Sequence, residues 1–170
     1  VPCDITADEV REMAPSAIIL SGGPASVNAE DAPRVDPAVF ELGVPVLGFC
    51  YGHQITAVTL GGTVFHPEVG EYGPAELHVA GGALFEGTPA SQTVWMSHFD
   101  AVQDVPEGFT LVASTDVCPV AAMENVEKKI YTTQFHPEVK HSECSQQILK
   151  NFLFGICGLE KNCCMDNLLE

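Results

Sequence analysis

The sequence Gly-Phe-Cys-Tyr-Gly at residues 48–52 places a thiol where it could act as a nucleophile. The apolar run 44–49 predicts a strand, and residues 54–60 predict a helix, so Cys50 lies on the turn between them. This arrangement is a nucleophile elbow with cysteine in the serine position. Glycine on either side permits a strained backbone, and the N-terminus of a helix favours the thiolate that attacks carbonyl carbon. A structural cysteine in an ordinary α/β turn is the alternative.

A second pattern, His136-Pro137-Glu138, follows the predicted strand 130–135. A residue before proline is extended, and extended residues at i and i+2 face the same way. His136 and Glu138 can therefore share one face, as an imidazole base and the carboxylate that sets its tautomer. The alternative is a surface turn after a strand.

The tetrapeptide His-Pro-Glu-Val occurs twice, at residues 66–69 and 136–139. The first copy follows the predicted elbow helix directly, where a strand end beside the thiol is hard to arrange. We therefore assign the catalytic pair to His136 and Glu138, and we predict an exposed turn for His66 and Glu68.

Ser-Gly-Gly-Pro at residues 21–24 ends the apolar run 17–20, which predicts a buried strand. Such a turn frees backbone N–H groups to face a ligand, and it could supply an oxyanion donor. A plain turn is the alternative. The Ser-Gly-Gly start also resembles the phosphate loop of ATP pyrophosphatases, but Pro24 and Ala25 replace the residues that this loop requires.

The remaining elements must position these residues. Thr6 caps a short helix at 8–13, residues 37–42 predict a second short helix, and 145–154 predict an amphipathic closing helix. Strands are expected within 63–79, 81–96, 109–113 and 120–123. The sequence thus predicts an α/β fold with an open, mostly parallel sheet and helices on both faces.

Composition limits the function classes. The 170 residues suit one domain. Seven Lys and Arg against 23 Asp and Glu give a formal charge of −16, which argues against nucleic acid as a partner. We expect no membrane segment, because no apolar run has spanning length. The seven cysteines show neither CxxC pairs nor a disulfide-like spacing, so we expect reduced thiols and a cytoplasmic protein.

With these motifs in view, the chain resembles the class I (triad) glutamine amidotransferases, and among them most the amidotransferase domain of GMP synthetases. The resemblance covers residues 1–157. Its most specific parts are Ile-Ile-Leu-Ser-Gly-Gly-Pro at 18–24, Gly-Phe-Cys-Tyr-Gly-His-Gln at 48–54, Glu-Tyr-Gly at 71–73, Val-Trp-Met-Ser-His at 94–98 and Gln-Phe-His-Pro-Glu-Val at 134–139.

The resemblance implies a role for each matching residue. Cys50 would attack the side-chain amide of L-glutamine, with His136 moving protons and Glu138 orienting it. The other implied site residues are the oxyanion donors Gly23 and Tyr51 and the substrate-binding residues Gln54, Ser97, His98 and Phe99. The domain itself would need no metal or cofactor. Its ammonia would serve the conversion of XMP to GMP, with ATP and Mg²⁺ bound by a separate synthetase domain.

The chain also departs from the family pattern. It begins at Val1-Pro2, and the first strand and the Gly-Ser-Gln-like turn of the family are absent, so we expect a truncated domain at 1–157. Residues 158–170 would start a linker to an ATP-pyrophosphatase synthetase domain, in the same chain or a separate subunit, through which a homodimer could form. Gly70 replaces a basic residue, and Phe99 a small one.

Three alternative functions remain open at this point. The chain could be an amidotransferase subunit for another acceptor, as in anthranilate or carbamoyl phosphate synthesis. It could be a γ-glutamyl hydrolase, which shares the elbow but cleaves peptides. It could also be a non-catalytic regulatory module, although a binding role would need neither Cys50 nor His136.

Overall fold

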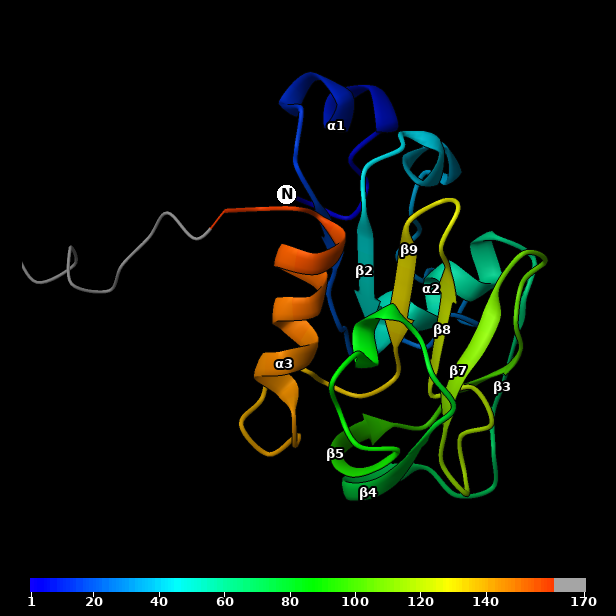
Figure 1. Cartoon of the computed structure of the whole chain (residues 1–170). Coiled ribbons are helices and arrows are strands. Elements are labelled where there is room, and N and C mark those ends of the chain that lie inside the picture. The colour runs from blue at the N-terminus through cyan, green and yellow to red at the C-terminus, as the bar shows by residue number, and fades with distance from the viewer. Residues whose placement is uncertain (161–170) are drawn as a thin grey trace, which may run out of the picture.

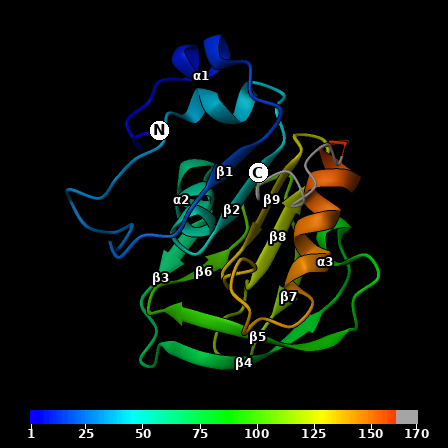
Figure 2. The same ribbon diagram turned by 90° about the vertical axis from the view of Figure 1, so that its left-hand side faces the viewer.

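Three short strands form the parallel part of the sheet in the computed structural model, which describes residues 1–160 (Figures 1 and 2). They are β1 (Ile18–Leu20), β2 (Val46–Phe49) and β9 (Ile130–Thr133). β2 lies between the other two and pairs parallel with both. β2 and β9 are buried along their whole length, as expected for strands covered on both faces. Their carboxyl ends meet at one edge of the sheet, where α/β proteins bind ligands.

The sheet continues beyond β9 with antiparallel strands. Its order is β1-β2-β9-β8-β7-β4-β5, with β8 (Ala122–Asn125), β7 (Thr110–Ser114), β4 (Glu71–Val79) and β5 (Ser91–His98). β3 (Thr63–Phe65) and β6 (Ala101–Asp104) form a separate antiparallel pair. The open α/β fold is confirmed. Parallel pairing is confined to β1, β2 and β9, because short turns such as that between β8 and β9 can join only antiparallel neighbours.

Helices cover both faces of the parallel strands, as predicted (Figures 1 and 2). α2 (Tyr51–Thr59) packs on one face, and α3 (Ser145–Lys150) continues into a π-helix (Asn151–Ile156) on the other. Ile148 and Phe152 pack there with Leu47 and Tyr131 in the largest core cluster. The predicted closing helix is thus two helical segments.

The N-terminal segment forms α1 (Ala7–Met13), which begins with the predicted cap. The Thr6 side chain accepts from the backbone N–H of Glu9, and the Glu9 carboxylate accepts from the N–H of Thr6. The second predicted helix forms as a 3₁₀ helix over Pro37–Glu41, where the Asp36 side chain caps the first turn.

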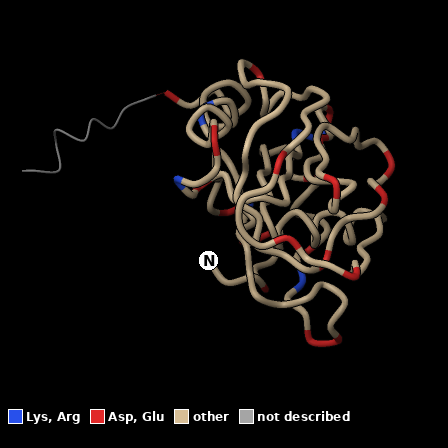
Figure 3. Tube along the Cα trace, turned by 90° about the horizontal axis from the view of Figure 1, so that it is seen from below, with Lys and Arg blue, Asp and Glu red and all other residues tan. Residues whose placement is uncertain are grey.

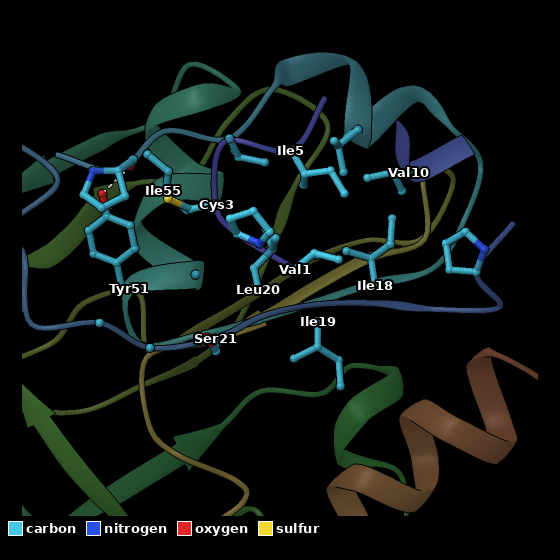
Figure 4. Close-up of a pocket in the computed structure, with 18 of the residues that line it drawn as sticks. Val1, Cys3, Ile5, Val10, Ile18, Ile19, Leu20, Ser21, Tyr51 and Ile55 are labelled. Carbon is cyan, nitrogen blue, oxygen red and sulfur yellow. Dashed lines mark hydrogen bonds between the residues drawn. The ribbon is translucent and has the colours of Figure 1, made fainter. Parts of the chain in front are cut away.

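β1 is an edge strand, and it differs from the prediction of a fully buried one. Ile19 is 52% exposed, and it points away from Ile18 and Leu20 (Figure 4). Beside β1 lies a cavity of about 440 Å³ with largely apolar walls, which reaches Gly23 and Tyr51. Figure 4 shows Val1, Ile5, Val10, Ile18, Leu20 and Ile55 around it.

The charged residues reflect the acidic composition. Figure 3 shows acidic positions distributed around the whole trace, with basic positions few and scattered. Among residues 1–160, no helix is long and apolar enough to cross a membrane. The predicted linker over 158–170, including Cys163 and Cys164, lies mostly outside the described residues.

His53 on α2 is completely buried and ties this helix to the sheet. Its Nε2 lies 3.0 Å from the carbonyl oxygen of Val120, which can only accept, so Nε2 carries the proton. Its Nδ1 then accepts from the Thr132 hydroxyl at 2.8 Å. Burial lowers the pKa of His53 to about 3, with a smaller contribution from the charge of His98. The ring is therefore neutral at physiological pH.

We expect His53 to make stability depend on pH. An unfolded histidine titrates near pH 6.5, so between about pH 6.5 and 3 the unfolded chain binds the additional proton. As the pH is lowered through this window, the free energy of unfolding should decrease by up to about 1.4 kcal/mol per pH unit because of this side chain. Above pH 6.5 its full contribution is present. Urea unfolding of wild type and His53→Gln at several pH values measures the difference, and parallel pH profiles would contradict the assignment.

Candidate active site

The elbow around Cys50 is built by two glycines that permit very close packing. A Cβ on Gly52 would lie 2.0 Å from the Leu20 carbonyl oxygen, and one on Gly48 would lie 2.7 Å from the carbonyl oxygen of Gly52. Neither position can hold a side chain. Cys50, between them, has φ 54° and ψ −112°, a strained conformation for a residue with a Cβ. Its N–H donates to the Thr133 carbonyl at the end of β9 (2.9 Å), which fixes the turn.

The thiol of Cys50 lies against two other segments. Its Sγ is 3.6 Å from the carbonyl oxygen of Ser97, at the end of β5. Gly22, in the turn after β1, faces both Cys50 and His136. A Cβ there would lie 3.8 Å from the sulfur and 3.1 Å from His136 Cε1. The structure therefore brings the elbow, the Gly-Gly-Pro turn and the histidine together, as the sequence predicted.

His136 is positioned by its backbone and by Glu138. Its N–H donates to the carbonyl of Trp95 (3.3 Å), and its carbonyl accepts from the Ser142 hydroxyl (2.8 Å). Its Nδ1 lies 2.7 Å from Glu138 Oε1, so the carboxylate holds a proton on Nδ1 and leaves Nε2 for the thiol. Sequence reasoning missed the support by Ser142, because no motif marks it.

The charge of His136 follows from these neighbours. The hydrogen bond with Cys50 is the largest cause that raises the pKa of His136 to about 9, and Glu138 adds to it against the cost of burial. The ring is thus protonated at neutral pH. An imidazolium beside a sulfur stabilises the thiolate. The Ser97 carbonyl can accept a hydrogen bond only from the neutral thiol. This contact therefore favours the protonated sulfur, whereas His136 favours the thiolate.

The two predicted oxyanion donors are neighbours. A Cβ on Gly23 would lie 3.8 Å from Tyr51 Cβ. Tyr51 begins α2, where backbone N–H groups have no carbonyl one turn earlier to accept from them. The hydroxyl of Tyr51 donates to the Pro33 carbonyl (2.5 Å), and both residues line the cavity beside β1. This arrangement suits two N–H donors beside Cys50.

The predicted substrate-binding residues fall into two groups. Gln54 is buried, and its Nε2 donates to the Asp100 carbonyl (2.6 Å) and to Gln134 Oε1 (3.1 Å). Both amide hydrogens are used, so Gln54 can offer a ligand only its oxygen. Ser97, near the end of β5, and Phe99, directly after β5, are exposed. The side chain of His98 instead points into the interior, toward Glu71 and the Asp100 carbonyl.

The first copy of the repeated tetrapeptide has contacts that its sequence did not reveal. The side chain of His66 is 67% exposed, in line with the predicted turn. Its Nδ1 nevertheless lies 2.7 Å from Asp100 Oδ1, and its ring stacks on Phe99 with centroids 4.0 Å apart. Asp100 also accepts from Ser26. His66 thus supports the turn after β5, whereas His136 lies beside Cys50.

One set of potential metal donors occurs among residues 1–160. Glu71, His98 and Cys118 have donor atoms within 4.8 Å of one another. The Cys118 thiol donates to the Val120 carbonyl (3.3 Å), and burial raises its pKa strongly. A metal ion would need the thiolate. The geometry therefore favours a hydrogen-bonded network, and no metal is needed to explain it.

Comparison with known proteins identifies the family of this chain. The family model for class-I glutamine amidotransferases matches residues 1–156. The chain belongs to this family. Membership confirms the resemblance drawn from the elbow, the Gly-Gly-Pro turn and the His-Pro-Glu sequence.

Among individual proteins, the chain is similar to GMP synthases. The chain is 54% identical over 172 residues to a glutamine-hydrolysing GMP synthase of Streptomyces avermitilis and 50% identical over 171 residues to one of Clostridium novyi. Each match covers 100% of this chain but only 33% of the relative, so the chain spans about a third of their length.

Solved structures of related proteins have a similar fold. A crystal structure attributed to a GMP synthase component of Thermoplasma acidophilum has a TM-score of 0.79 at 34% identity, covering 93% of this chain and 79% of that one. A glutamine amidotransferase of Thermotoga maritima, at 24% identity and TM-score 0.63, covers 82% of this chain and 61% of its own and supports the fold.

We expect Gly52→Ala to destabilise this amidotransferase domain strongly, because the added methyl group overlaps the Leu20 carbonyl. The loss should reach about 3 kcal/mol or more, at the upper end for an overpacked site. Gly155→Ala is the control, since a Cβ there meets no atom within 4 Å. Thermal and urea unfolding measure both variants, and equal stability of the two would contradict the packing argument.

We also expect His136 to control the reactivity of Cys50. At pH 7 the imidazolium stabilises the thiolate, so His136→Gln should slow iodoacetamide labelling of Cys50 by roughly tenfold. The difference should shrink above about pH 9, where His136 loses its proton and ordinary thiols ionise. Peptide mass spectrometry follows the modification, with Cys144 as an internal reference. A pH-independent ratio would contradict the imidazolium.

Proposed function

We propose that this chain hydrolyses L-glutamine to glutamate and ammonia, with Cys50 as the nucleophile. The observation that carries the proposal is the meeting of the elbow thiol with His136, whose Nδ1 is held by Glu138 (2.7 Å). A thiol, an imidazole and a carboxylate in this order form a nucleophile, its base and the group that orients the base. The alternative of a regulatory module gives these contacts no purpose.

In the first half-reaction the thiolate of Cys50 attacks the side-chain amide carbon of glutamine, and a C–S bond forms. The carbonyl oxygen becomes an oxyanion that accepts from the N–H groups of Gly23 and Tyr51, each such donor typically contributing about 3 kcal/mol. When the C–N bond breaks, His136 gives its proton to the leaving nitrogen. The products are ammonia and a γ-glutamyl thioester.

In the second half-reaction a water molecule attacks the thioester carbon. His136, now neutral, accepts a proton from this water, and the same two N–H groups hold the new oxyanion. The C–S bond then breaks, glutamate leaves, and the sulfur returns as a thiolate beside the imidazolium. Glu138 keeps the ring orientation through both steps.

The substrate-binding roles of the nearby polar groups follow from the hydrogen-bond donors and acceptors that they leave unused. The oxygen of Gln54 can accept from the α-ammonium group of glutamine, because both hydrogens of its amide are already used. The Ser97 carbonyl lies beside the Cys50 sulfur, and the His98 side chain supports the same turn through the Asp100 carbonyl. We therefore assign the segment Ser97, His98 and Phe99 to the border of the substrate site. The strongly acidic chain repels a zwitterion less than a free nucleotide.

We further propose that the ammonia serves GMP synthesis. The relatives named as GMP synthases are about three times as long as this chain, which leaves room for a second activity. That partner would be an ATP-pyrophosphatase synthetase domain, in the same chain or a separate subunit, that uses ATP and Mg²⁺ to activate XMP. No metal or cofactor would act in the glutaminase domain.

The glutaminase proposal predicts selective labelling of Cys50 by a diazo-ketone analogue of glutamine. Free glutamine should block the reaction, and Cys50→Ala should abolish both labelling and glutamate release. Cys144→Ala serves as the control, because this half-buried cysteine lies at the start of α3 and should leave labelling unchanged. Mapping of all seven cysteines by mass spectrometry is the measurement. Glutamine turnover by the Cys50→Ala variant would refute the assignment.

The acceptor needs a separate experiment. The complete protein should form GMP from XMP, ATP and glutamine, and Cys50→Ala should retain this activity only with added ammonium. Release of glutamate from γ-glutamyl peptides without a partner would instead indicate a γ-glutamyl hydrolase, the second enzymatic alternative.

A further inference from the structure

A buried polar network lies behind the end of β5. Glu71 on β4 and His98 on β5 are opposite one another in the strand register. Their side chains are 10% and 1% exposed, and Glu71 Oε2 is 3.0 Å from His98 Nε2. The other carboxylate oxygen of Glu71 lies 2.8 Å from the Thr115 hydroxyl. These groups do not touch the thiol of Cys50.

The hydrogen-bond inventory determines where the protons are. His98 Nδ1 lies 3.0 Å from the Asp100 carbonyl oxygen, which can only accept, so Nδ1 carries a hydrogen. A neutral ring would then aim the lone pair of Nε2 at the Glu71 carboxylate. A proton must lie between these two atoms. With this proton on Nε2, the pair is an imidazolium and a carboxylate, and the carboxylate accepts on both of its oxygens.

Thr115 completes the network around Glu71. Its oxygen accepts the N–H groups of Cys118 (2.9 Å) and Val117 (3.3 Å), so its own hydrogen is free to donate to Glu71 Oε1. Both oxygens of this carboxylate are therefore satisfied without solvent. A fully paired network of this kind holds its members in one arrangement.

The network is connected to the active site through the turn after β5. The Asp100 carbonyl that accepts from His98 also accepts from the amide of Gln54 (2.6 Å). The carbonyl of Ser97, next to His98 in the chain, lies 3.6 Å from the sulfur of Cys50. The orientation of these two carbonyls depends on where His98 is held.

We propose that Glu71 is a positioning residue of the amidotransferase site. It holds His98 in a doubly protonated, fixed orientation, and through His98 it places the Ser97 and Asp100 carbonyls against Cys50 and Gln54. The inference rests on the proposed glutaminase function for its kinetic consequence, but the protonation of His98 can be tested independently of any activity.

The first experiment is ¹⁵N NMR of the histidine rings in the full chain, with His98 assigned by the signal lost in His98→Gln. At neutral pH His98 should show hydrogens on both ring nitrogens. In Glu71→Gln only Nδ1 should keep its hydrogen, because the new amide donates to Nε2. Glu76→Gln, on the exposed side of β4, is the matched control and should change nothing.

The second experiment compares kinetics in the complete protein. Glu71→Ala should lower kcat/KM for glutamine roughly ten- to a hundredfold, because the displaced turn carries the carbonyls that face Cys50 and Gln54. Glu71→Gln preserves both hydrogen bonds in a neutral form, so it should recover most of this loss. Thermal unfolding checks that the compared variants are folded. If Glu71→Ala does not fold, the NMR comparison of wild type with Glu71→Gln tests the inference instead.

Several results would overturn the inference. These are a single hydrogen on His98 in wild type, a folded Glu71→Ala variant with unchanged kinetics, or a Glu71→Gln variant as impaired as Glu71→Ala. Stoichiometric zinc that is lost in Cys118→Ala would replace it with a metal site. If wild type fails to hydrolyse glutamine while His98 is doubly protonated, the proposed function fails and the network stands.

Discussion

The close approach of α2 to the end of β1 is the constraint on which the site depends. The carbonyl of Leu20 occupies the space that any side chain at Gly52 would need. Because Gly52 has no side chain, α2 can begin directly against the ends of β1 and β2. This contact fixes the strained turn at Cys50 and lets Gly22 lie against the thiol. The energy stored in that turn is offset by the packing of the whole helix.

Surroundings, rather than residue type, set the charge of the histidines near this helix. His53 is buried between the Val120 carbonyl and the Thr132 hydroxyl, and it is neutral. His136 faces a thiol and a carboxylate, and it is positive. A single fold thus holds one imidazole neutral and another positively charged, although the two are the same residue type.

Sequence patterns predicted the parts of the site that depend on local geometry. The spacing of Gly48, Cys50 and Gly52 specifies an elbow, and the Pro after His136 specifies an extended pair, so both were confirmed as local arrangements. The strand order of the antiparallel half could not be predicted in this way, because pairings such as that of β4 with β7 are set by the whole sheet and leave no local pattern. Glu71 meets His98 across 27 positions, and no pattern near either residue indicates which face of the strand it occupies.

Asp100 is a shared hydrogen-bond partner of several segments near the thiol. Its carboxylate receives Ser26 and His66, and its carbonyl receives Gln54 and His98, so it joins the segments after β1 and β3 to α2 and β5. Loops on protein surfaces usually open one at a time, each with its own small free energy. Here four segments share one anchor, so a displacement of Asp100 would disturb all four at once.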